Sequence, residues 1–239
     1  MKAVILAGGL GTRLRPLTYV MPKAMLPVGN KPILEHTIEF LKSKGIKEII
    51  LATGYLGKIV EEYFGDGSKW DVSIKYKLAR PLGTAGQLKT ASDEISDTFL
   101  AMNGDILVNV DIDSMRRQHS ETNASVTVAV REFQYQLKYG ILDFDGNNVV
   151  HSWNEKPTKS SWMNIGLYLM EPRILNLIPN ETAYSLEHEV FPKVIESGPH
   201  LFSFKTATSY LDIGDLASLD AANQKYEEVP ANVSNFFAV

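Results

Sequence analysis

Three features that many proteins have are missing from this sequence. None of the 239 residues is cysteine, which excludes disulfides, thiolate nucleophiles and cysteine-ligated zinc. No apolar run approaches the roughly 20 residues that span a bilayer, so we expect no membrane partner. The net charge is only −4, which gives no general attraction to nucleic acid, and we expect no nucleic-acid partner. Any phosphate that the protein binds must therefore be held by a local cluster of cations.

The N-terminal segment does not look like a targeting signal. Residues 3–7 form an apolar run directly after Met1-Lys2, but the run is too short for a signal peptide and ends at Gly8-Gly9. Hydrophobic residues make up 44% of the chain and charged residues 22%, which is the composition of an ordinary globular protein. We therefore expect a cytoplasmic protein.

Short apolar runs alternate with helical patterns in the first half of the chain. The continuous apolar run 3–7 is typical of a strand that is covered on both faces. Pro32 opens a helical pattern that Gly45 stops. The patterns predict strands at 3–7, 48–53, 72–76 and 99–103, and helices at 32–41, 56–64 and 84–92. Strands and helices in alternation predict a parallel, doubly wound sheet.

The second half is richer in strands. Strands are predicted at 125–130, 140–144, 149–153 and 164–170, and helices at 114–120, 172–178, 186–196 and 216–226. No linker or internal repeat separates the halves, so we expect them to share one sheet. The predicted fold is α/β, a single three-layer α/β/α Rossmann-like domain over residues 1–239 with a mostly parallel mixed sheet. The apolar tail 229–239 can dock on the body or on a neighbour, so the sequence is compatible with a homodimer.

A glycine-rich loop follows the first predicted strand. It reads Gly8-Gly9-Leu10-Gly11-Thr12-Arg13, and three glycines at the carboxyl end of a strand let backbone amides approach a ligand closely. The dinucleotide fingerprint fails because Leu14 stands where its last glycine is required, and the Gly-Lys-Ser/Thr of a P-loop is absent. Arg13 and Arg15 favour a loop that brings its own cations to a polyphosphate. The alternative is a tight turn with surface arginines.

A proline-rich segment comes next. Pro22 and Pro27 stiffen the backbone around Lys23, so its ammonium is presented from a rigid segment. The loop and this segment together resemble the signature of the sugar-phosphate nucleotidyltransferases, also called sugar nucleotide pyrophosphorylases: Gly-Gly-x-Gly-Thr-Arg-Leu-x-Pro-Leu-Thr, then Pro-Lys-x-x-x-Pro. Longer members of that family continue into a left-handed β-helix, so the resemblance is to the short form.

The resemblance implies a nucleotide site in the first half, about 1–120. Arg80-Pro81-Leu82-Gly83-Thr84-Ala85-Gly86 resembles the family's second glycine loop, which lies against the base; the alternative is a strand-to-helix turn capped by Thr84. Arg13 and Lys23 are the implied catalytic cations. The implied nucleotide-binding residues are Leu6, Ala7, Gly8, Gly9, Gly11, Thr12, Arg13, Pro81, Gly83, Thr84, Ala85 and Gly104.

The resemblance also implies a Mg²⁺ site and a sugar-phosphate site. Asp105 and Asp212 are the implied metal ligands, although Tyr210 stands where many relatives carry Trp. For the rival pair Asp111 and Asp113 we prefer a helix cap at Asp113. The sugar-phosphate residues, all in the half at about 121–228, are Tyr139, Gly140, Glu155, Lys156, Asn164 and Gly166. Seen alone, Glu155-Lys156 would be a solvated strand end.

The implied reaction joins an NTP and a sugar 1-phosphate into an NDP-sugar and releases pyrophosphate. Leu82 to Gly86 looks most like the guanylyltransferases that act on mannose or manno-heptose 1-phosphate, and glucose-1-phosphate thymidylyl- or uridylyltransferases are the alternative. A rival of another class is a regulatory subunit that binds nucleotide sugar without turnover. Such a subunit would be expected to have lost Arg13, Lys23 or a metal aspartate, and all of these are present.

Overall fold

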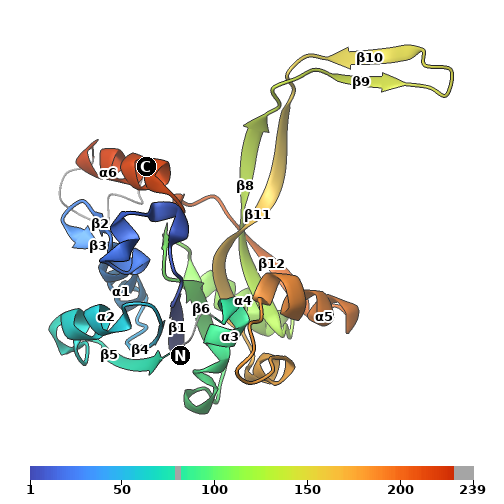
Figure 1. The fold of residues 1–239 in the computed structure, drawn as a ribbon. Coiled ribbons are helices and arrows are strands. Elements are labelled where there is room, and N and C mark those ends of the chain that lie inside the picture. The colour runs from blue at the N-terminus through green and yellow to red at the C-terminus, as the bar shows by residue number, and fades with distance from the viewer. Residues whose placement is uncertain (79–81, 229–239) are drawn as a thin grey trace.

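A seven-stranded mixed sheet forms the centre of the protein. The computed structural model describes residues 1–78 and 82–228, and its sheet has the strand order β12-β8-β11-β6-β1-β4-β5 (Figure 1). The strands are β1 (Lys2–Ala7), β4 (Glu48–Thr53), β5 (Ser73–Leu78), β6 (Phe99–Asn103), β8 (Val126–Gln136), β11 (Thr158–Met170) and β12 (Leu201–Thr206). The predicted α/β class and mostly parallel mixed sheet are confirmed.

The first half of the chain builds the parallel side of the sheet. β1 lies between β4 and β6 and is parallel to both, and β4 is parallel to β5. Alternate side chains of β1 enter two separate cores, Ala3 and Ile5 on one face and Val4 and Leu6 on the other. Helices α1 (Ile33–Ser43), α2 (Gly57–Phe64) and α4 (Ile112–Glu121) cover the first face, and α3 (Gly83–Lys89) and α5 (Phe191–Glu196) cover the second. The result is the predicted three-layer arrangement.

The second half extends the same sheet. β11 is antiparallel to both β6 and β8, and β12 runs parallel to β8 at the edge. The prediction that the halves share one sheet is therefore confirmed for β8 and β11. It is wrong for β9 (Ile141–Phe144) and β10 (Val150–Asn154), which form a separate two-stranded hairpin. A turn at Asp145 connects them, with the Asn147 amide donating to the Asp145 side chain over 2.8 Å.

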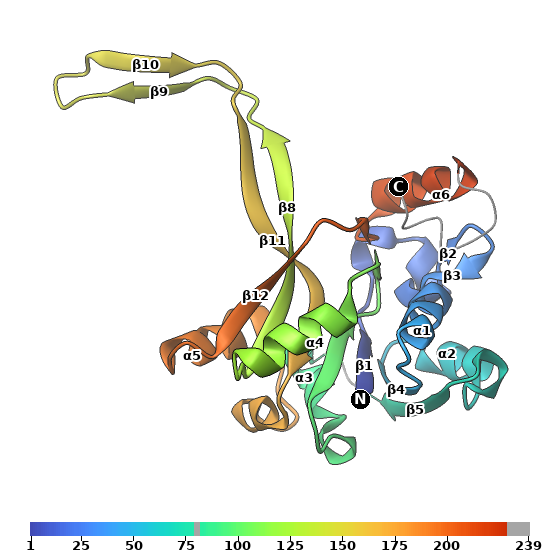
Figure 2. The same ribbon diagram turned by 180° about the vertical axis from the view of Figure 1, so that it is seen from behind.

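The hairpin sits at the end of a long projection, which we call the arm and define as residues 131–163. β8 and β11 are longer than predicted because their ladder continues past Val130–Asn164 to Gln136–Thr158. β9 and β10 then bend away from the side on which α6 (Leu216–Glu228) lies (Figure 1), and the view from behind shows the same separation (Figure 2). The side chains of the arm change from buried to exposed as β8 leaves the body.

Short elements line the rim at the carboxyl ends of the parallel strands. β7 (Ile106–Val108) pairs with β13 (Tyr210–Asp212), and β2 (Pro27–Val28) pairs with β3 (Lys31–Pro32). Single turns of 3₁₀-helix at Thr12–Leu14, Leu17–Tyr19 and Lys23–Met25 belong to the same rim. Other 3₁₀ turns, at Ser68–Trp70 and Ser92–Glu94, precede β5 and β6; a longer 3₁₀ segment spans Pro172–Leu177, and a π turn spans Leu186–Val190. In the described part of the chain, no helix combines the length and the apolar character needed to cross a bilayer.

The helix-cap prediction was wrong in its residue. Helix α4 begins at Ile112, two positions before the predicted start, and its N-cap is Asp111 rather than Asp113. The Asp111 carboxylate accepts from the Ser114 amide over 3.0 Å, and that hydrogen bond lowers its pKa together with the bond from the Ser114 hydroxyl. Aspartate is a favoured N-cap residue and stands at both 111 and 113, so the sequence alone did not distinguish the two positions.

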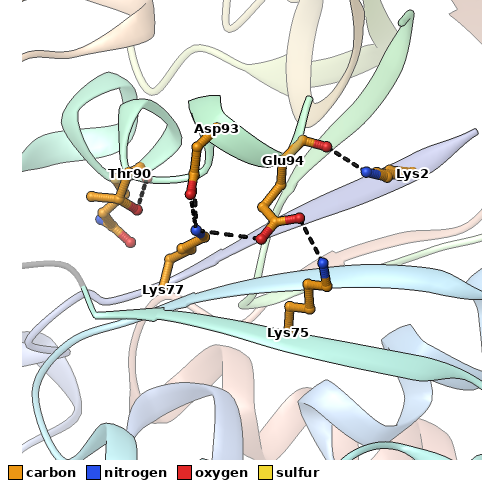
Figure 3. Close-up of polar contacts among 7 residues, drawn as sticks. Lys2, Lys75, Lys77, Thr90, Asp93 and Glu94 are labelled. Atoms are coloured by element: carbon orange, nitrogen blue, oxygen red, sulfur yellow. Dashed lines mark hydrogen bonds and ion pairs between the residues drawn. The ribbon is translucent and has the colours of Figure 1, made fainter. Parts of the chain in front are cut away.

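A network of ion pairs anchors the edge strand β5 (Figure 3). Lys75 pairs with Glu94 over 2.7 Å and Lys77 with Asp93 over 2.6 Å, while Lys2 donates to the Glu94 backbone oxygen. Hydrogen bonds from the lysines lower the pKa values of Asp93 and Glu94. Exposed pairs of this kind contribute little each, but lysines on an edge strand discourage pairing with another chain.

Candidate active site

The glycine-rich loop is held in place by contacts that exclude larger side chains. The Gly8 amide donates to the Gln87 side-chain oxygen over 2.8 Å, and a Cβ at Gly8 would lie only 2.7 Å from that same atom. Gly9 has open space around it and is exposed at the rim. The loop thus packs on α3 through Gly8 and leaves Gly9 accessible to a ligand.

Gly11 ties the loop to the segment that carries Lys23. Its φ of +59° lies in the left-handed region, which favours glycine. The Thr18 hydroxyl donates to the Gly11 carbonyl over 2.8 Å. A Cβ at Gly11 would lie 2.9 Å from Thr18 Cγ2 and 3.1 Å from Lys23 Cβ. Because this approach is so close, the loop and the Lys23 segment form one unit.

Lys23 and Asp105 form an ion pair at the centre of the rim. Lys23 opens the 3₁₀ turn Lys23–Met25, and Asp105 sits between β6 and β7, 82 positions later in the chain. Their side chains are 13% and 28% exposed. The pair is therefore shielded from bulk water, yet it remains open on the side where a ligand would enter.

Asp212 lies beside Asp105 because two short strands pair. Asp212 is opposite Ile106 in the β13–β7 ladder, and the Ile213 amide donates to the Asp105 carbonyl over 3.0 Å. Burial of its carboxyl and the neighbouring charge of Asp105 raise the pKa of Asp212, while Lys23 and Arg13 act in the opposite direction. The residue as a whole stays open to solvent.

Arg13 completes the group from the other side. A Cβ at Gly214 would lie 3.2 Å from a guanidinium nitrogen of Arg13, so the glycine makes room for that side chain. The structure thus brings together Arg13, Lys23, Asp105 and Asp212, two cations and two anions that come from three distant parts of the chain. We call these four residues the rim cluster.

A cavity of about 160 Å³ opens next to the rim cluster. Its lining residues come from β1 and its loop, the Lys23 segment, α3 and the end of β6: Leu6, Ala7, Gly9, Lys23, Ala24, Thr84, Gln87, Asn103, Gly104 and Asp105. A larger hollow, about 630 Å³, lies near Met1 at the opposite ends of the strands, but the rim cluster is not part of it. The smaller cavity is therefore the candidate site, because ligands of open α/β sheets bind at strand carboxyl ends.

The second glycine loop packs against the segment before α5. Gly83 has φ +68°, and a Cβ there would lie 2.6 Å from the Tyr184 carbonyl oxygen. That oxygen accepts from the Ala85 amide over 2.9 Å. Thr84 does not cap the helix with its hydroxyl, which donates to Glu187 over 2.9 Å. Pro81 lies outside the described residues.

Glu187 is a residue that the sequence reasoning missed. Its carboxylate accepts from Thr84, from the Ser185 hydroxyl over 2.7 Å and from the Tyr168 hydroxyl over 2.9 Å. Burial alone would raise the pKa of Glu187, but these hydrogen bonds outweigh it and lower that pKa. The sequence carried no signal for it, because Leu186–Val190 reads as part of an amphipathic helix.

The same network reaches two of the predicted sugar-side residues. Asn164 donates to the Tyr168 hydroxyl over 2.8 Å and accepts from the Gly166 amide over 2.8 Å. A Cβ at Gly166 would lie 2.6 Å from Asn103 Nδ2. Within the described residues Asn103 Oδ1 is a buried acceptor without a partner, and Asn103 lines the cavity. Asn103 was also missed, although it directly precedes Gly104-Asp105.

The other four predicted sugar-side residues lie on the arm. Glu155 accepts from the Trp153 indole over 3.1 Å, and a Cβ at Gly140 would lie 2.6 Å from Glu155 Oε2. Tyr139 is 81% exposed, and Lys156 has φ +46°. All four follow the outer end of the β8–β11 ladder, from which the hairpin projects away from the body (Figure 1), and none of them lines the cavity beside the rim cluster.

Comparison with known proteins identifies the family. The model of the nucleotidyl transferase family matches residues 2–229. The chain belongs to the nucleotidyl transferase family. It is 33% identical over 233 residues to a UTP–glucose-1-phosphate uridylyltransferase of Synechocystis, covering 90% of this chain and 60% of that protein. It is 34% identical over 223 residues to the mannose-1-phosphate guanylyltransferase catalytic subunit beta of Danio rerio, covering 90% and 61%. The chain thus spans about 60% of the length of these family members.

Solved structures of similar proteins share the fold over nearly the whole chain. HddC from Yersinia pseudotuberculosis, complexed with GMP-PN, superposes with a TM-score of 0.74 at 27% identity and covers 94% of this chain and 99% of that one. A protein from Bacillus anthracis assigned as a glucose-1-phosphate thymidylyltransferase, in complex with sucrose, gives a TM-score of 0.76 at 26% identity and covers 98% and 99%. Both matches extend across the two halves of the chain.

Proposed function

We propose that the chain is the catalytic part of a cytoplasmic sugar-1-phosphate nucleotidyltransferase, which makes an NDP-sugar and pyrophosphate from an NTP and a sugar 1-phosphate. One observation carries the proposal: Arg13 and Lys23 face Asp105 and Asp212 beside the glycine-rich loop. Family membership and the transferases among the similar proteins support it. The single nucleotidyltransferase domain of residues 1–239 is part of the same proposal.

The chemistry needs charge and alignment more than it needs a protein nucleophile. A phosphate oxygen of the sugar 1-phosphate is already ionised at neutral pH, so it can attack the α-phosphorus of the NTP without a general base. Both reactants are anions, and holding them in line is the main task. The amides from Gly9 to Thr12 and the Arg13 guanidinium would hold the triphosphate. Lys23 would stabilise the charge that develops at the phosphorus.

The rim cluster also fits a divalent cation. Asp105 and Asp212 place two carboxylates side by side, and their mutual repulsion contributes to the raised pKa of Asp212. Oxygen ligands from one or two carboxylates, completed by substrate phosphates, are what Mg²⁺ prefers. When bound there, Mg²⁺ would neutralise charge on the phosphate oxygens. Lys23, already paired with Asp105, would hold that carboxylate in position.

The second glycine loop, whose Thr84 lines the cavity, is our candidate for selecting the base. Our best assignment is GTP with mannose or manno-heptose 1-phosphate, in line with the guanylyltransferases among the similar proteins. The alternative is glucose 1-phosphate with dTTP or UTP, in line with the uridylyltransferase. The test is a matrix of the four NTPs and dTTP against glucose, mannose, manno-heptose and N-acetylglucosamine 1-phosphates, read by pyrophosphate release. Absence of pyrophosphate in every pair would contradict the proposed activity.

The metal assignment has its own test. Asp212→Asn removes one carboxylate charge but keeps the size of the side chain. We expect the Mg²⁺ concentration for half-maximal activity to rise by about tenfold or more. Metal affinity falls by about this factor even when the changed residue only supports a metal ligand. Asp220→Asn, at an exposed position of α6, is the matched control. An unchanged Mg²⁺ titration in Asp212→Asn would remove Asp212 from the site.

A further inference from the structure

A small apolar core joins the segments that carry the rim cluster, and it is separate from the two cores on the faces of the central sheet. Its buried members come from the glycine-rich loop, the segment from Lys23 to β2, α1, β7, the residue after β13, and α6. They are Leu14, Leu26, Val28, Ile33, Leu107, Ile213 and Ala222, and the partly buried Leu211, Leu219 and Tyr226 pack against them. We call these residues the rim core.

Each residue of the rim cluster has a member of the rim core close to it in the chain. The pairs are Arg13–Leu14, Lys23–Leu26, Asp105–Leu107 and Asp212–Ile213. The core member of each pair is at most 3% exposed. A catalytic group keeps its geometry to within about 0.5 Å when packing fixes the residues that support it. The rim core supplies such packing to all four charged residues at once.

Backbone hydrogen bonds connect this packing to the charged residues themselves. The Leu26 amide donates to the Lys23 carbonyl over 3.1 Å, and the Ile213 amide donates to the Asp105 carbonyl over 3.0 Å. Each donor is a buried member of the rim core. A shift of Leu26 or Ile213 within that core would therefore move Lys23 or Asp105 with it.

Helix α6 closes the rim core and joins its two sides. It begins at Leu216, shortly after Asp212 in the chain, and it contacts both β13 and β2. The front and back views both show α6 beside β2 (Figure 1, Figure 2). Its residue Ala222 is fully buried in the rim core. Among the described residues that line the cavity, none belongs to α6, so the helix supports the rim without lining the site.

Asn223 ties α6 to the turn between β2 and β3. Its side-chain oxygen accepts from the Gly29 amide over 2.8 Å, and its side-chain nitrogen donates to the Pro27 carbonyl over 3.3 Å. Gly29 has φ +63°, and a Cβ there would overlap the Tyr226 ring, so the helix sits directly on the turn. Because Pro27 directly follows Leu26, these two bonds fix the backbone next to the rim core.

We propose that α6 is a positioning element of the active site and that Asn223 is its positioning residue. The inference rests on the proposed function. Asn223 holds the turn that follows the Lys23 segment, while α6 itself continues the chain from Asp212, so the helix sets the separation between the lysine and the aspartates. These charged residues lie on single turns, a loop and a short strand, which are mobile unless packing holds them. Misplacing a reacting group by about 1 Å can cost about 10²-fold in rate.

The first test compares substitutions at two neighbouring positions of α6. Asn223→Ala removes both bonds to the β2–β3 turn, whereas Gln224→Ala, the matched control, removes a bond to Asp220 within the helix. Alanine is the better helix former at both positions, so neither change weakens the helix itself. Well below the unfolding temperature, we expect kcat of Asn223→Ala to fall about tenfold or more, with both KM values changed by less than about twofold. Gln224→Ala should keep the wild-type kcat.

The division of the effect between kcat and KM distinguishes positioning from a purely structural role. A structural role would lower the unfolding temperature of Asn223→Ala and leave the kcat of the folded variant at the wild-type value, which would overturn the proposal. A rise in either KM at unchanged kcat would overturn it as well, because the helix would then act on binding rather than on alignment.

Amide hydrogen exchange supplies a second test that does not depend on activity. The amides of Gly29, Leu26 and Ile213 donate to the bonds described above. In Asn223→Ala we expect all three to exchange about tenfold faster, because loosening the turn also loosens the rim core. Gln224→Ala should leave the three rates unchanged. Faster exchange at Gly29 alone would show that the rim core does not follow the turn, and the proposal would fail.

The two proposals can fail separately. If the wild type releases no pyrophosphate with any substrate pair, the proposed function fails, and the exchange measurement still decides whether α6 holds the rim. If the wild type is active and Asn223→Ala turns over at the same rate, the function stands and α6 is not a positioning element.

Discussion

The rim cluster and the arm are assembled in opposite ways. At the rim, Arg13, Lys23, Asp105 and Asp212 come from three distant segments and meet because the strands beneath them are packed on both faces. On the arm, β8 pairs with β11 and β9 with β10, and most of the large apolar side chains of the β9–β10 hairpin remain exposed. The packing of the body thus fixes the positions of the four rim side chains, whereas the arm extends beyond the body. Perturbing each region should therefore change different measurements.

The largest expected effect is at the rim. Lys23→Ala should lower turnover by about 10²–10³-fold, because it removes a preorganised charge from the reacting phosphates. Lys47→Ala, which removes an exposed lysine paired with Asp71, is the control and should leave turnover unchanged. Near-normal turnover in Lys23→Ala would contradict the role of the rim cluster.

The next largest effect is a difference in unfolding free energy between variants of the body and variants of the arm. Leu100→Ala in β6, at a fully buried position, should cost about 2–5 kcal/mol of unfolding free energy because a cavity is left in the core. Phe144→Ala on the hairpin should cost less than about 0.5 kcal/mol at protein concentrations where the chain is monomeric. Urea unfolding of both variants measures the difference. Equal losses would mean that the hairpin is part of the folding unit of a single chain.

A smaller effect is expected from the arm on substrate binding. Lys156→Ala should raise KM for the sugar 1-phosphate about tenfold or more, the worth of one charge-assisted hydrogen bond, and leave KM for the NTP unchanged. Lys159→Ala, another exposed lysine on the arm, is the matched control. If both KM values rise together in Lys156→Ala, the residue does not select the sugar side.

The smallest effect concerns the acid range. The pKa of Glu187 lies below its ordinary value of 4.5 in the folded protein, so its contribution to stability is present above about pH 4.5 and is lost as the pH falls through the folded pKa. Glu187→Gln should flatten the dependence of unfolding free energy on pH in this range. Glu196→Gln, exposed at the end of α5, is the control, and denaturant titrations at several pH values are the measurement. An unchanged slope would show that the hydrogen bonds to Glu187 do not persist in solution.

Most of the body could be predicted because its segments carry strong local signals. The run Ala3 to Ala7 ending at Gly8-Gly9 predicted β1, and alternation with helical patterns predicted that the strands of the first half are parallel. Five strands, β2, β3, β7, β12 and β13, were missed; four of them have only two or three residues, and β12 has no continuous apolar run. The cap at Asp111 was missed because Asp113 competes for the same role.

Motifs in the sequence pointed to the residues of the rim cluster, but they did not predict how these residues are arranged in space. No local pattern in the sequence indicates that β13, the strand that contains Asp212, pairs with β7, the strand that follows Asp105. This pairing sets the separation of the two aspartates. The sequence analysis did not identify Glu187 or Asn103, because their contacts are with residues distant in the sequence. The lengths of β8 and β11 were underestimated because the outer parts of these strands are largely exposed and mostly polar, and the predicted strands ended where the apolar runs ended.

The sequence by itself determined which chemistry is available: no thiol, a loop of glycines with its own arginine, a lysine between prolines and two aspartates after short strands. Local rules were sufficient there, because backbone freedom and charge belong to individual residues. The tertiary structure alone decided that these groups share one rim and that the arm leaves it. Both outcomes depend on strand pairings between residues distant in sequence, which only the packing of the whole sheet selects.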